Sequence, residues 1–115
     1  MTMGREKIAI TSASQGGLDD LVAQSFGRCK TFTIVELEGS RIVKVEAIEN
    51  PAVSVGHGAG PLAAQTLANK GVSKVVVTRL GPRAEAALRS LGIEVVYVEP
   101  EITVREALRK LGVKA

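Results

Sequence analysis

Longer stretches in the second half of the chain repeat apolar residues every three or four positions, with polar residues between them. This spacing predicts helices, because it places the apolar side chains along one face of each helix. The last stretch begins with Thr103 and Glu106 in a capping-box pattern and ends before Gly112. The pattern predicts helices over residues 61–70, 82–91 and 103–111.

Shorter apolar segments predict strands. Residues 7–11 and 74–78 have continuous apolar middles, which is typical of strands covered on both faces. The turn sequence Glu38-Gly39-Ser40-Arg41 lies between two further segments and indicates a hairpin. The predicted strands are residues 7–11, 31–37, 42–48, 74–78 and 94–98.

The order of these elements indicates an α/β fold. A hairpin after the first strand, followed by right-handed crossovers, leaves the second strand antiparallel to all the others. We therefore expect a five-stranded mixed sheet of order 3-2-1-4-5, flanked by helices, with residues 75–77 beside residues 8–10.

A short repeat marks the helical half of the chain. Gly60-Pro61 recurs 21 positions later as Gly81-Pro82, and Gly71 recurs at the same spacing as Gly92. Proline suits the first helical turn, where its missing N–H would have no partner, and glycine suits the left-handed residue after a helix. Each repeat therefore predicts a helix that starts at Gly-Pro and ends at Gly, followed by a strand.

The composition fits one globular domain over residues 1–115. The chain is 45% hydrophobic and 23% charged, which is typical of a folded protein. Its apolar runs are far shorter than the roughly 20 residues of a membrane-spanning helix, and residues 1–6 lack the apolar core of a signal peptide. The single cysteine excludes an intramolecular disulfide. We expect a cytoplasmic protein without a membrane partner.

The charge of the chain is mildly positive, with a formal net charge of +3 and a pI near 9.3. A nucleic-acid-binding surface usually combines clustered basic residues with stacking aromatic residues. Here Lys and Arg are scattered, and the aromatic residues are Phe26, Phe32 and Tyr97. We therefore expect no nucleic-acid partner. The charge suits a small anionic ligand and an ordinary solvated surface equally well.

Residues with binding chemistry fall at one edge of the predicted sheet. Ligands of open α/β sheets bind beyond the carboxyl ends of the parallel strands, and two Gly-Pro helix starts would add N–H groups that attract anions there. Cys29 and His57 are the candidate metal ligands, as the only Cys and the only His of the chain. The full candidate set is Ser12, Ser14, Gly27, Arg28, Cys29, Lys30, His57, Gly58, Gly60, Arg79, Gly81 and Arg83.

Several of these residues also have purely structural interpretations. Cys29 could be a small buried hydrophobic residue, and His57 could be an ordinary surface residue of a glycine-rich loop. Ser12 and Ser14 could cap a turn. These alternatives stay open from the residues alone.

Catalytic and conventional metal-binding patterns are missing from the sequence. The glycine-rich segment 56–60 has no following Gly-Lys-Ser/Thr, and no acidic residue stands about 20 positions on, as a dinucleotide site would require. Asp19 and Asp20 are adjacent in a predicted loop rather than on strands, and His57 has no acidic partner for a triad. One cysteine cannot hold an iron–sulfur cluster or a closed zinc site. A bound metal cluster would therefore have to bring its own sulfide ligands.

Four motifs together resemble one known family over residues 7–111. They are Gln24-Ser25-Phe26-Gly27-Arg28-Cys29 with Phe32, Glu49-Asn50-Pro51, Gly58-Ala59-Gly60-Pro61-Leu62-Ala63-Ala64-Gln65, and Leu80-Gly81-Pro82 with Ala84. The chain resembles the dinitrogenase iron–molybdenum-cofactor biosynthesis family, whose small orange-protein subgroup holds a molybdenum–copper sulfide cluster without covalent bonds. The resemblance implies a ribonuclease-H-like topology, no nuclease activity and noncovalent binding of an anionic metal–sulfur cluster.

The sequence departs from the family at one position of the first motif. Many relatives carry His directly before Phe-Gly-Arg, where this chain has Ser25, so Cys29 and His57 remain as candidate ligands. The first functional hypothesis is a non-enzymatic carrier or store of a molybdenum-containing cluster, either Mo–Cu sulfide or Fe–Mo–S, with a protein partner in cofactor delivery or regulation. The alternatives are a regulatory protein-interaction module and a small-anion or nucleotide-binding domain.

Overall fold

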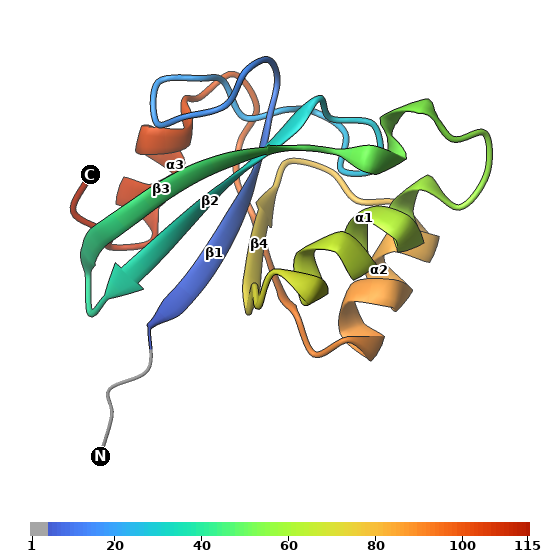
Figure 1. Cartoon of the computed structure of the whole chain (residues 1–115). Helices are drawn as coiled ribbons and strands as arrows, with labels where there is room; N and C mark the ends of the chain where they lie inside the picture. Colours follow the sequence, from blue (N-terminus) through green and yellow to red (C-terminus); the bar gives the residue numbers. More distant parts are fainter. Residues whose placement is uncertain (1–4) are drawn as a thin grey trace.

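The computed structural model describes residues 5–115, in which three consecutive strands come first and helices alternate with strands in the second half (Figure 1). Residues 1–4, part of the segment in which we expect no signal peptide, lie outside the described residues. The elements in chain order are β1 (Glu6–Ser12), β2 (Thr31–Glu38), β3 (Arg41–Glu49), the 3-10 helix η1 (Pro51–Ser54), α1 (Ala59–Asn69), β4 (Lys74–Val77), α2 (Pro82–Ser90), β5 (Glu94–Tyr97) and α3 (Val104–Lys110).

Within residues 5–115 the strands form a five-stranded sheet of order β3-β2-β1-β4-β5, which confirms the predicted topology. β2 is antiparallel to β1 and β3, whereas β4 is parallel to both β1 and β5. Ala9 lies opposite Val75 and Ile10 opposite Val76. The two segments predicted to be neighbours are therefore adjacent. Their register differs from the prediction by one residue, because residues 8–10 lie beside residues 74–76 rather than 75–77.

Helices cover the two faces of the sheet. α1 and α2 pack on one face, where Ala9, Phe32 and Val75 contribute to a buried cluster with Leu67 and Leu88. α3 packs on the other face. The buried side chains of the cluster there are Ile8, Ile10, Val22, Val35, Leu37, Val76, Ile102, Val104, Ala107, Leu108 and Val113. Alternate residues of β1 and β4 thus enter different clusters, as expected for strands with both faces buried. Each fully buried Leu or Ile contributes roughly 1.5–3 kcal/mol to the stability of this arrangement.

The two Gly-Pro dipeptides occupy different helical positions, which corrects the predicted equivalence of the repeats. α2 begins at Pro82, after Gly81 in an extended conformation. α1 begins at Ala59, two residues before the predicted start at Pro61, because Gly58 adopts a left-handed conformation with φ of 71° and serves as its N-cap. The predicted ends are confirmed: Gly71 and Gly92 follow the helices with φ of 79° and 74°.

Side-chain caps fix two further boundaries. Thr103 and Glu106 form the predicted capping box at the start of α3, with the Thr103 hydroxyl accepting from the Glu106 N–H at 3.1 Å. Asn50 caps η1 by accepting a hydrogen bond from the Ala52 N–H at 3.0 Å. The apolar pattern did not predict this short helix. None of the helices within residues 5–115 is long and apolar enough to cross a membrane.

Candidate functional site

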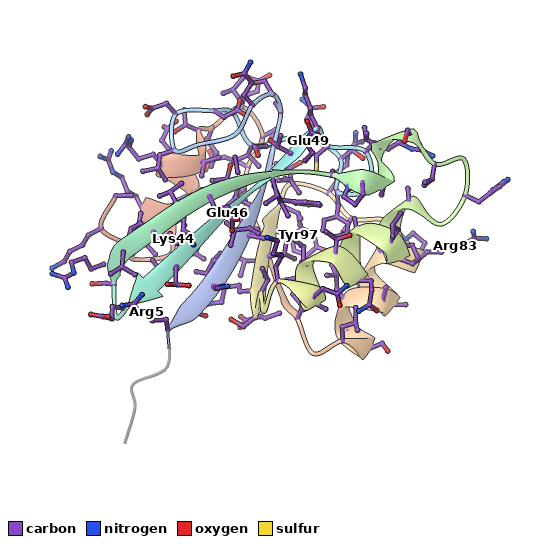
Figure 2. The ribbon with its side chains drawn as sticks, viewed as in Figure 1. Arg5, Lys44, Glu46, Glu49, Arg83 and Tyr97 are labelled. Carbon is purple, nitrogen blue, oxygen red and sulfur yellow. The ribbon has the colours of Figure 1, made fainter. Side chains whose placement is uncertain are left out.

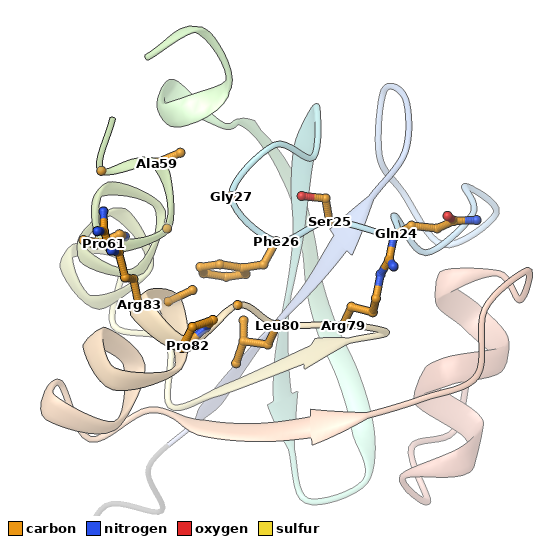
Figure 3. Close-up of a pocket in the computed structure, with 14 residues that line it drawn as sticks. Gln24, Ser25, Phe26, Gly27, Ala59, Pro61, Arg79, Leu80, Pro82 and Arg83 are labelled. Atoms are coloured by element: carbon orange, nitrogen blue, oxygen red, sulfur yellow. The ribbon is translucent and has the colours of Figure 1, made fainter. Parts of the chain in front are cut away.

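A pocket with a volume of about 640 Å³ opens beyond the carboxyl end of β4. Its walls come from three parts of the chain: the loop between β1 and β2, the start of α1, and the segment that joins β4 to α2 (Figure 3). The lining residues are Gln24, Ser25, Phe26, Gly27, Gly58, Ala59, Gly60, Pro61, Arg79, Leu80, Gly81, Pro82, Arg83 and Ala84. This is the sheet edge at which open α/β folds usually bind ligands.

Two glycines allow the three walls to meet. A Cβ atom placed on Gly60 would lie 2.8 Å from the Cβ of Ala84, so the starts of α1 and α2 are as close as their backbones permit. A Cβ on Gly27 would lie 3.2 Å from the backbone nitrogen of Gly60. Larger residues at either position would push the loop and the helices apart and change the shape of the pocket.

The starts of α1 and α2 give the pocket a positive backbone potential. The first intrahelical bonds are donated by Leu62 to the Gly58 carbonyl at 3.0 Å and by Glu85 to the Gly81 carbonyl at 2.9 Å. The N–H groups before these positions have no partner within their helix. They belong to Ala59 and Gly60 on α1 and to Arg83 and Ala84 on α2, all of which line the pocket. Each helix start also carries the positive end of its dipole.

Two arginine side chains add full charges to the same pocket. Arg79 and Arg83 are exposed, and within residues 5–115 neither side chain makes an ion pair or a hydrogen bond. Figure 3 shows them on opposite sides of the Phe26 ring. Phe26 itself is buried, and its ring centroid lies 5.5 Å from that of Phe32. The pocket thus combines an apolar floor at Phe26 and Leu80 with positive charge at its margins.

Arg28 lies next to the lining residue Gly27 but is committed to a backbone contact. Its guanidinium Nη1 donates to the Val55 carbonyl at 2.7 Å and to the Val53 carbonyl at 3.5 Å. This contact ties the loop after β1 to the segment that leads into α1. Arg28 therefore holds two walls of the pocket together.

Cys29 is buried beneath the pocket rather than part of its lining. Its thiol donates to the Phe26 carbonyl at 3.3 Å, and Asn50 Nδ2 donates to Cys29 Sγ at 3.6 Å and to the Cys29 carbonyl at 3.0 Å. Burial raises the pKa of the thiol to about 12, with the hydrogen bond from Asn50 acting in the opposite direction. Cys29 is therefore protonated near neutral pH, whereas a metal ligand would have to be a thiolate.

The remaining sequence-predicted residues lie apart from the pocket. Ser12 Oγ is 2.6 Å from Thr31 Oγ1 in a buried hydroxyl network, and Ser14 Oγ donates to Asp20 Oδ1 at 2.8 Å. Lys30 lines a separate cavity of about 500 Å³ beside β3. His57 is exposed in the loop before Gly58. The structure thus divides the predicted rim and brings together Gly27, Gly58, Gly60, Arg79, Gly81 and Arg83.

Several lining residues were not among the predicted site residues. Gln24, Ser25 and Phe26 reach the pocket from the loop after β1, and Leu80 and Pro82 reach it from the β4–α2 connection. The signal for them was present in the sequence, because all belong to the motifs that carry the family resemblance. These motifs, distant along the chain, meet at one pocket.

A simple metal ion has no ready ligand set in the described part of the chain. Residues 5–115 contain no group of three or more His, Cys, Asp or Glu side chains arranged to hold an ion. The donors at the pocket are instead backbone N–H groups, the guanidinium groups of Arg79 and Arg83, and the neutral side chains of Gln24 and Ser25. They suit an anion that already carries its own metal ligands.

Comparison with known proteins extends the likeness to the whole domain. The apo form of the orange protein from Desulfovibrio gigas has a similar structure, with a TM-score of 0.83 and 36% sequence identity. The match covers 92% of this chain and 86% of the orange protein. A NifB-like protein from Thermotoga is 31% identical over 93% of this chain and 87% of its own, with a TM-score of 0.77.

A curated relative matches a shorter segment. An uncharacterized protein from Methanocaldococcus jannaschii is 44% identical over 70 residues, which are 61% of this chain and 59% of that protein. The chain thus spans little more than half of this relative. The family model described as dinitrogenase iron-molybdenum cofactor matches residues 6–113. This match takes in every element from β1 to α3, so the chain belongs to the dinitrogenase iron–molybdenum cofactor family.

Proposed function

We propose that the pocket between α1 and α2 binds an anionic metal–sulfur cluster that contains molybdenum, and that the protein carries or stores this cluster. The observation that carries the proposal is the convergence of two helix starts and two arginines on one cavity. Such an arrangement stabilises a multiply charged anion, because the charges of Arg79 and Arg83 and both helix dipoles act on it together. Membership of the family supports the same ligand class.

The pocket would hold the cluster without a covalent bond to the protein. Gly58, Gly60 and Gly81 leave the backbone open to the pocket, so that N–H groups can approach sulfide atoms closely. Arg79 and Arg83 would balance the charge, and Phe26 and Leu80 would provide apolar contact beneath it. The cluster needs no side-chain ligand for this, since its own sulfides complete the coordination of its metals.

Two cluster types fit this description, and we favour a Mo–Cu sulfide cluster over one related to the iron–molybdenum cofactor. The likeness to the orange protein supports this choice, as does Ser25 at the position where many relatives have a His ligand. Cys29 then acts by holding the Phe26 carbonyl through its thiol, while Asn50 holds the Gly27 carbonyl, rather than by binding metal. His57 directly precedes the lining residue Gly58 on an exposed loop, and in this proposal it is not needed as a ligand.

We infer that the protein has no turnover of its own. The groups around the pocket are backbone N–H donors, two guanidinium groups, the Gln24 amide, the Ser25 hydroxyl and apolar side chains, and this set lacks a carboxylate or an imidazole that could act as a general base. The cluster would then pass to or from a protein partner in cofactor delivery or regulation. The single cysteine, protonated and buried, is compatible with a cytoplasmic location.

Anaerobic reconstitution tests this function. The purified protein is mixed with tetrathiomolybdate and a copper(I) salt, desalted, and examined by visible absorption and elemental analysis. We expect visible bands that stay with the protein, and molybdenum and copper in a fixed ratio. The same preparation with Arg79→Glu/Arg83→Glu, which reverses the pocket charge at two exposed side chains, serves as the matched comparison and should lose the bands. Retention of the bands by this variant, or their absence from the wild type, would contradict the proposal.

A further inference from the structure

The free edge of β3 is a surface outside the pocket at which another strand could pair. β3 forms one end of the sheet (Figure 1), and its extensive contacts are with β2. Within residues 5–115, no backbone hydrogen bond outside the β2 ladder involves residues 43–49. Edge strands of this kind present unpaired N–H and C=O groups to any strand that can align with them.

Two features limit the length of this edge. The pairing with β2 shifts register opposite Glu36 and Leu37, which marks a bulge at Val43. Before the bulge, Lys114 forms a bridge with Arg41 and donates its N–H to the Ser40 carbonyl at 2.8 Å. The C-terminal residues thus cover the start of β3, and the free stretch begins at residue 43.

The side chains along the free stretch are complementary to themselves in the antiparallel direction. Around a two-fold axis at Val45, Lys44 stands opposite Glu46 of a second copy, Glu46 opposite its Lys44, and Val45 opposite its Val45. Figure 2 shows Lys44 and Glu46 along β3. Val45 is 40% exposed, and it would be covered by its counterpart.

Charge selects this register over its neighbours. A shift of the axis by one residue places Lys44 opposite Lys44, or Glu46 opposite Glu46, and like charges directly opposite each other destabilise a strand pair. Glu46 already has one ion pair, with its Oε2 3.5 Å from Lys70 Nζ. Its second carboxylate oxygen has no partner among the described residues and can accept Lys44 of the other copy.

We propose that two copies of this chain associate through antiparallel pairing of residues 43–47 of β3, with the two-fold axis at Val45. The axis stands perpendicular to the sheet, so the α1–α2 layers of both copies lie on the same side of one continuous sheet. The paired stretch is short, and we therefore expect a concentration-dependent equilibrium rather than a permanent dimer. The proposal does not depend on the function proposed for the pocket.

Charge exchange on β3 tests the association by sedimentation velocity over a range of protein concentrations. We expect the wild type to move from monomer to dimer as concentration rises. Lys44→Glu and Glu46→Lys should each raise the dimer dissociation constant about tenfold or more, because each turns two attractive pairs into two repulsive ones. The double variant Lys44→Glu/Glu46→Lys should recover most of the affinity. Glu94→Lys on β5, at the far edge, is the matched control and should change little.

A cysteine placed on the axis gives a second test. Residues directly opposite in an antiparallel pair have Cα atoms about 4.5–5.5 Å apart, within the range of a disulfide. Val45→Cys should therefore form a covalent dimer on mild oxidation, whereas Val43→Cys, which faces residue 47 of the other copy, should not. A wild type that stays monomeric, charge variants that behave like Glu94→Lys, or equal cross-linking of the two cysteine variants would each overturn the proposal.

Discussion

Gly60 on α1 and Ala84 on α2 meet so closely that a Cβ atom added to Gly60 would lie 2.8 Å from the Ala84 Cβ. Ala84 is buried, and both residues line the pocket. This contact sets the distance between the two helix starts, whose N–H groups define the candidate site. The packing of the helices and the shape of the pocket therefore depend on the same pair of residues.

Replacement of Gly60 by Ala should lower stability and disturb the pocket together. The added methyl group must displace Ala84 or the start of α1, and overpacking of this kind costs about 1–3 kcal/mol. Gly56→Ala is the control, because Gly56 has no heavy atom within 4 Å of the added Cβ. Urea unfolding gives the free energy of unfolding of both variants. A free energy of unfolding for Gly60→Ala equal to that of Gly56→Ala would show that the helices have room to spare.

Asp20 organises the loop after β1 through its carboxylate. Burial alone would raise the pKa of Asp20, but hydrogen bonds from Ser14, Gly16 and Leu21 outweigh it, so the pKa lies below its ordinary value. A lowered pKa in the folded state means that the carboxylate stabilises the protein at neutral pH and that this contribution disappears as the pH falls through the folded pKa.

Asp20→Asn should therefore lower the free energy of unfolding by about 1–3 kcal/mol at pH 7, and by less in acid. Asp19→Asn is a control at the adjacent position, since Asp19 is exposed and makes a single ion pair with Arg105 at 3.1 Å. Its effect should stay below about 1 kcal/mol. The comparison is made by urea unfolding at pH 7 and in acid. Equal losses at the two positions would contradict the assigned role of Asp20.

Cys29 should make the protein less stable in alkali. Its pKa is about 12 in the folded state against 9.0 as the ordinary value, so between these limits the unfolded chain loses a proton that the folded chain keeps. The contribution of this thiol to the free energy of unfolding is therefore fully present below about pH 9. It falls as the pH rises further, by at most about 1.4 kcal/mol per pH unit.

The free energy of unfolding is measured for the wild type and for Cys29→Ala from pH 8 toward the folded-state pKa of about 12. The difference between the two proteins separates the effect of the thiol from the titration of lysines. The wild type should lose stability more steeply than the variant. A thiol reagent should likewise react with the native protein much more slowly than with the unfolded chain, because the reactive species is the thiolate. Parallel pH profiles, or fast native labelling, would show that the thiol is accessible.

Arg28 should control the mobility of the segment before α1. Arg28→Ala removes the hydrogen bonds to the Val53 and Val55 carbonyls. The rate of amide hydrogen exchange over residues 53–58 should then rise about fivefold, which corresponds to about 1 kcal/mol of local stability. Arg28→Lys should recover part of the protection, because the ammonium group can reach one carbonyl. Arg79→Ala serves as the control. Unchanged exchange in Arg28→Ala would mean that other contacts hold this segment.

The sequence predicted the order and directions of the strands, though not the register of β1 on β4, because the strands carry strong local signals. The continuous apolar middles of β1 and β4 and the Glu38-Gly39-Ser40-Arg41 turn left few other ways to arrange the chain. The start of α1 was wrong by two residues, since Pro61 signalled a first turn while Gly58 can adopt the left-handed cap conformation that moves the start to Ala59.

The candidate site was harder to predict, because loops decide which side chains face the pocket. Arg79 follows β4 closely and Arg83 lies in the first turn of α2, and both line the pocket at the expected edge. The residues after β1 lie on a long irregular loop, where hydrogen bonds turn Arg28 toward Val55 and bury Cys29 beneath Phe26. Such tertiary contacts leave no periodic trace in the sequence, so position along the chain could not separate lining residues from supporting ones.

The central claim is that charge converging on the pocket of α1 and α2 holds an anionic metal–sulfur cluster. The most direct measurement is the affinity of the anaerobic protein for a thiomolybdate–copper cluster at several salt concentrations, for the wild type and two double variants. Arg79→Ala/Arg83→Ala removes the pocket charges, and Arg41→Ala/Arg89→Ala removes two exposed arginines elsewhere. We predict that salt weakens binding to the wild type, that the pocket variant binds at least about tenfold more weakly with a smaller salt dependence, and that the control matches the wild type. Equal affinities for the two double variants would contradict the account.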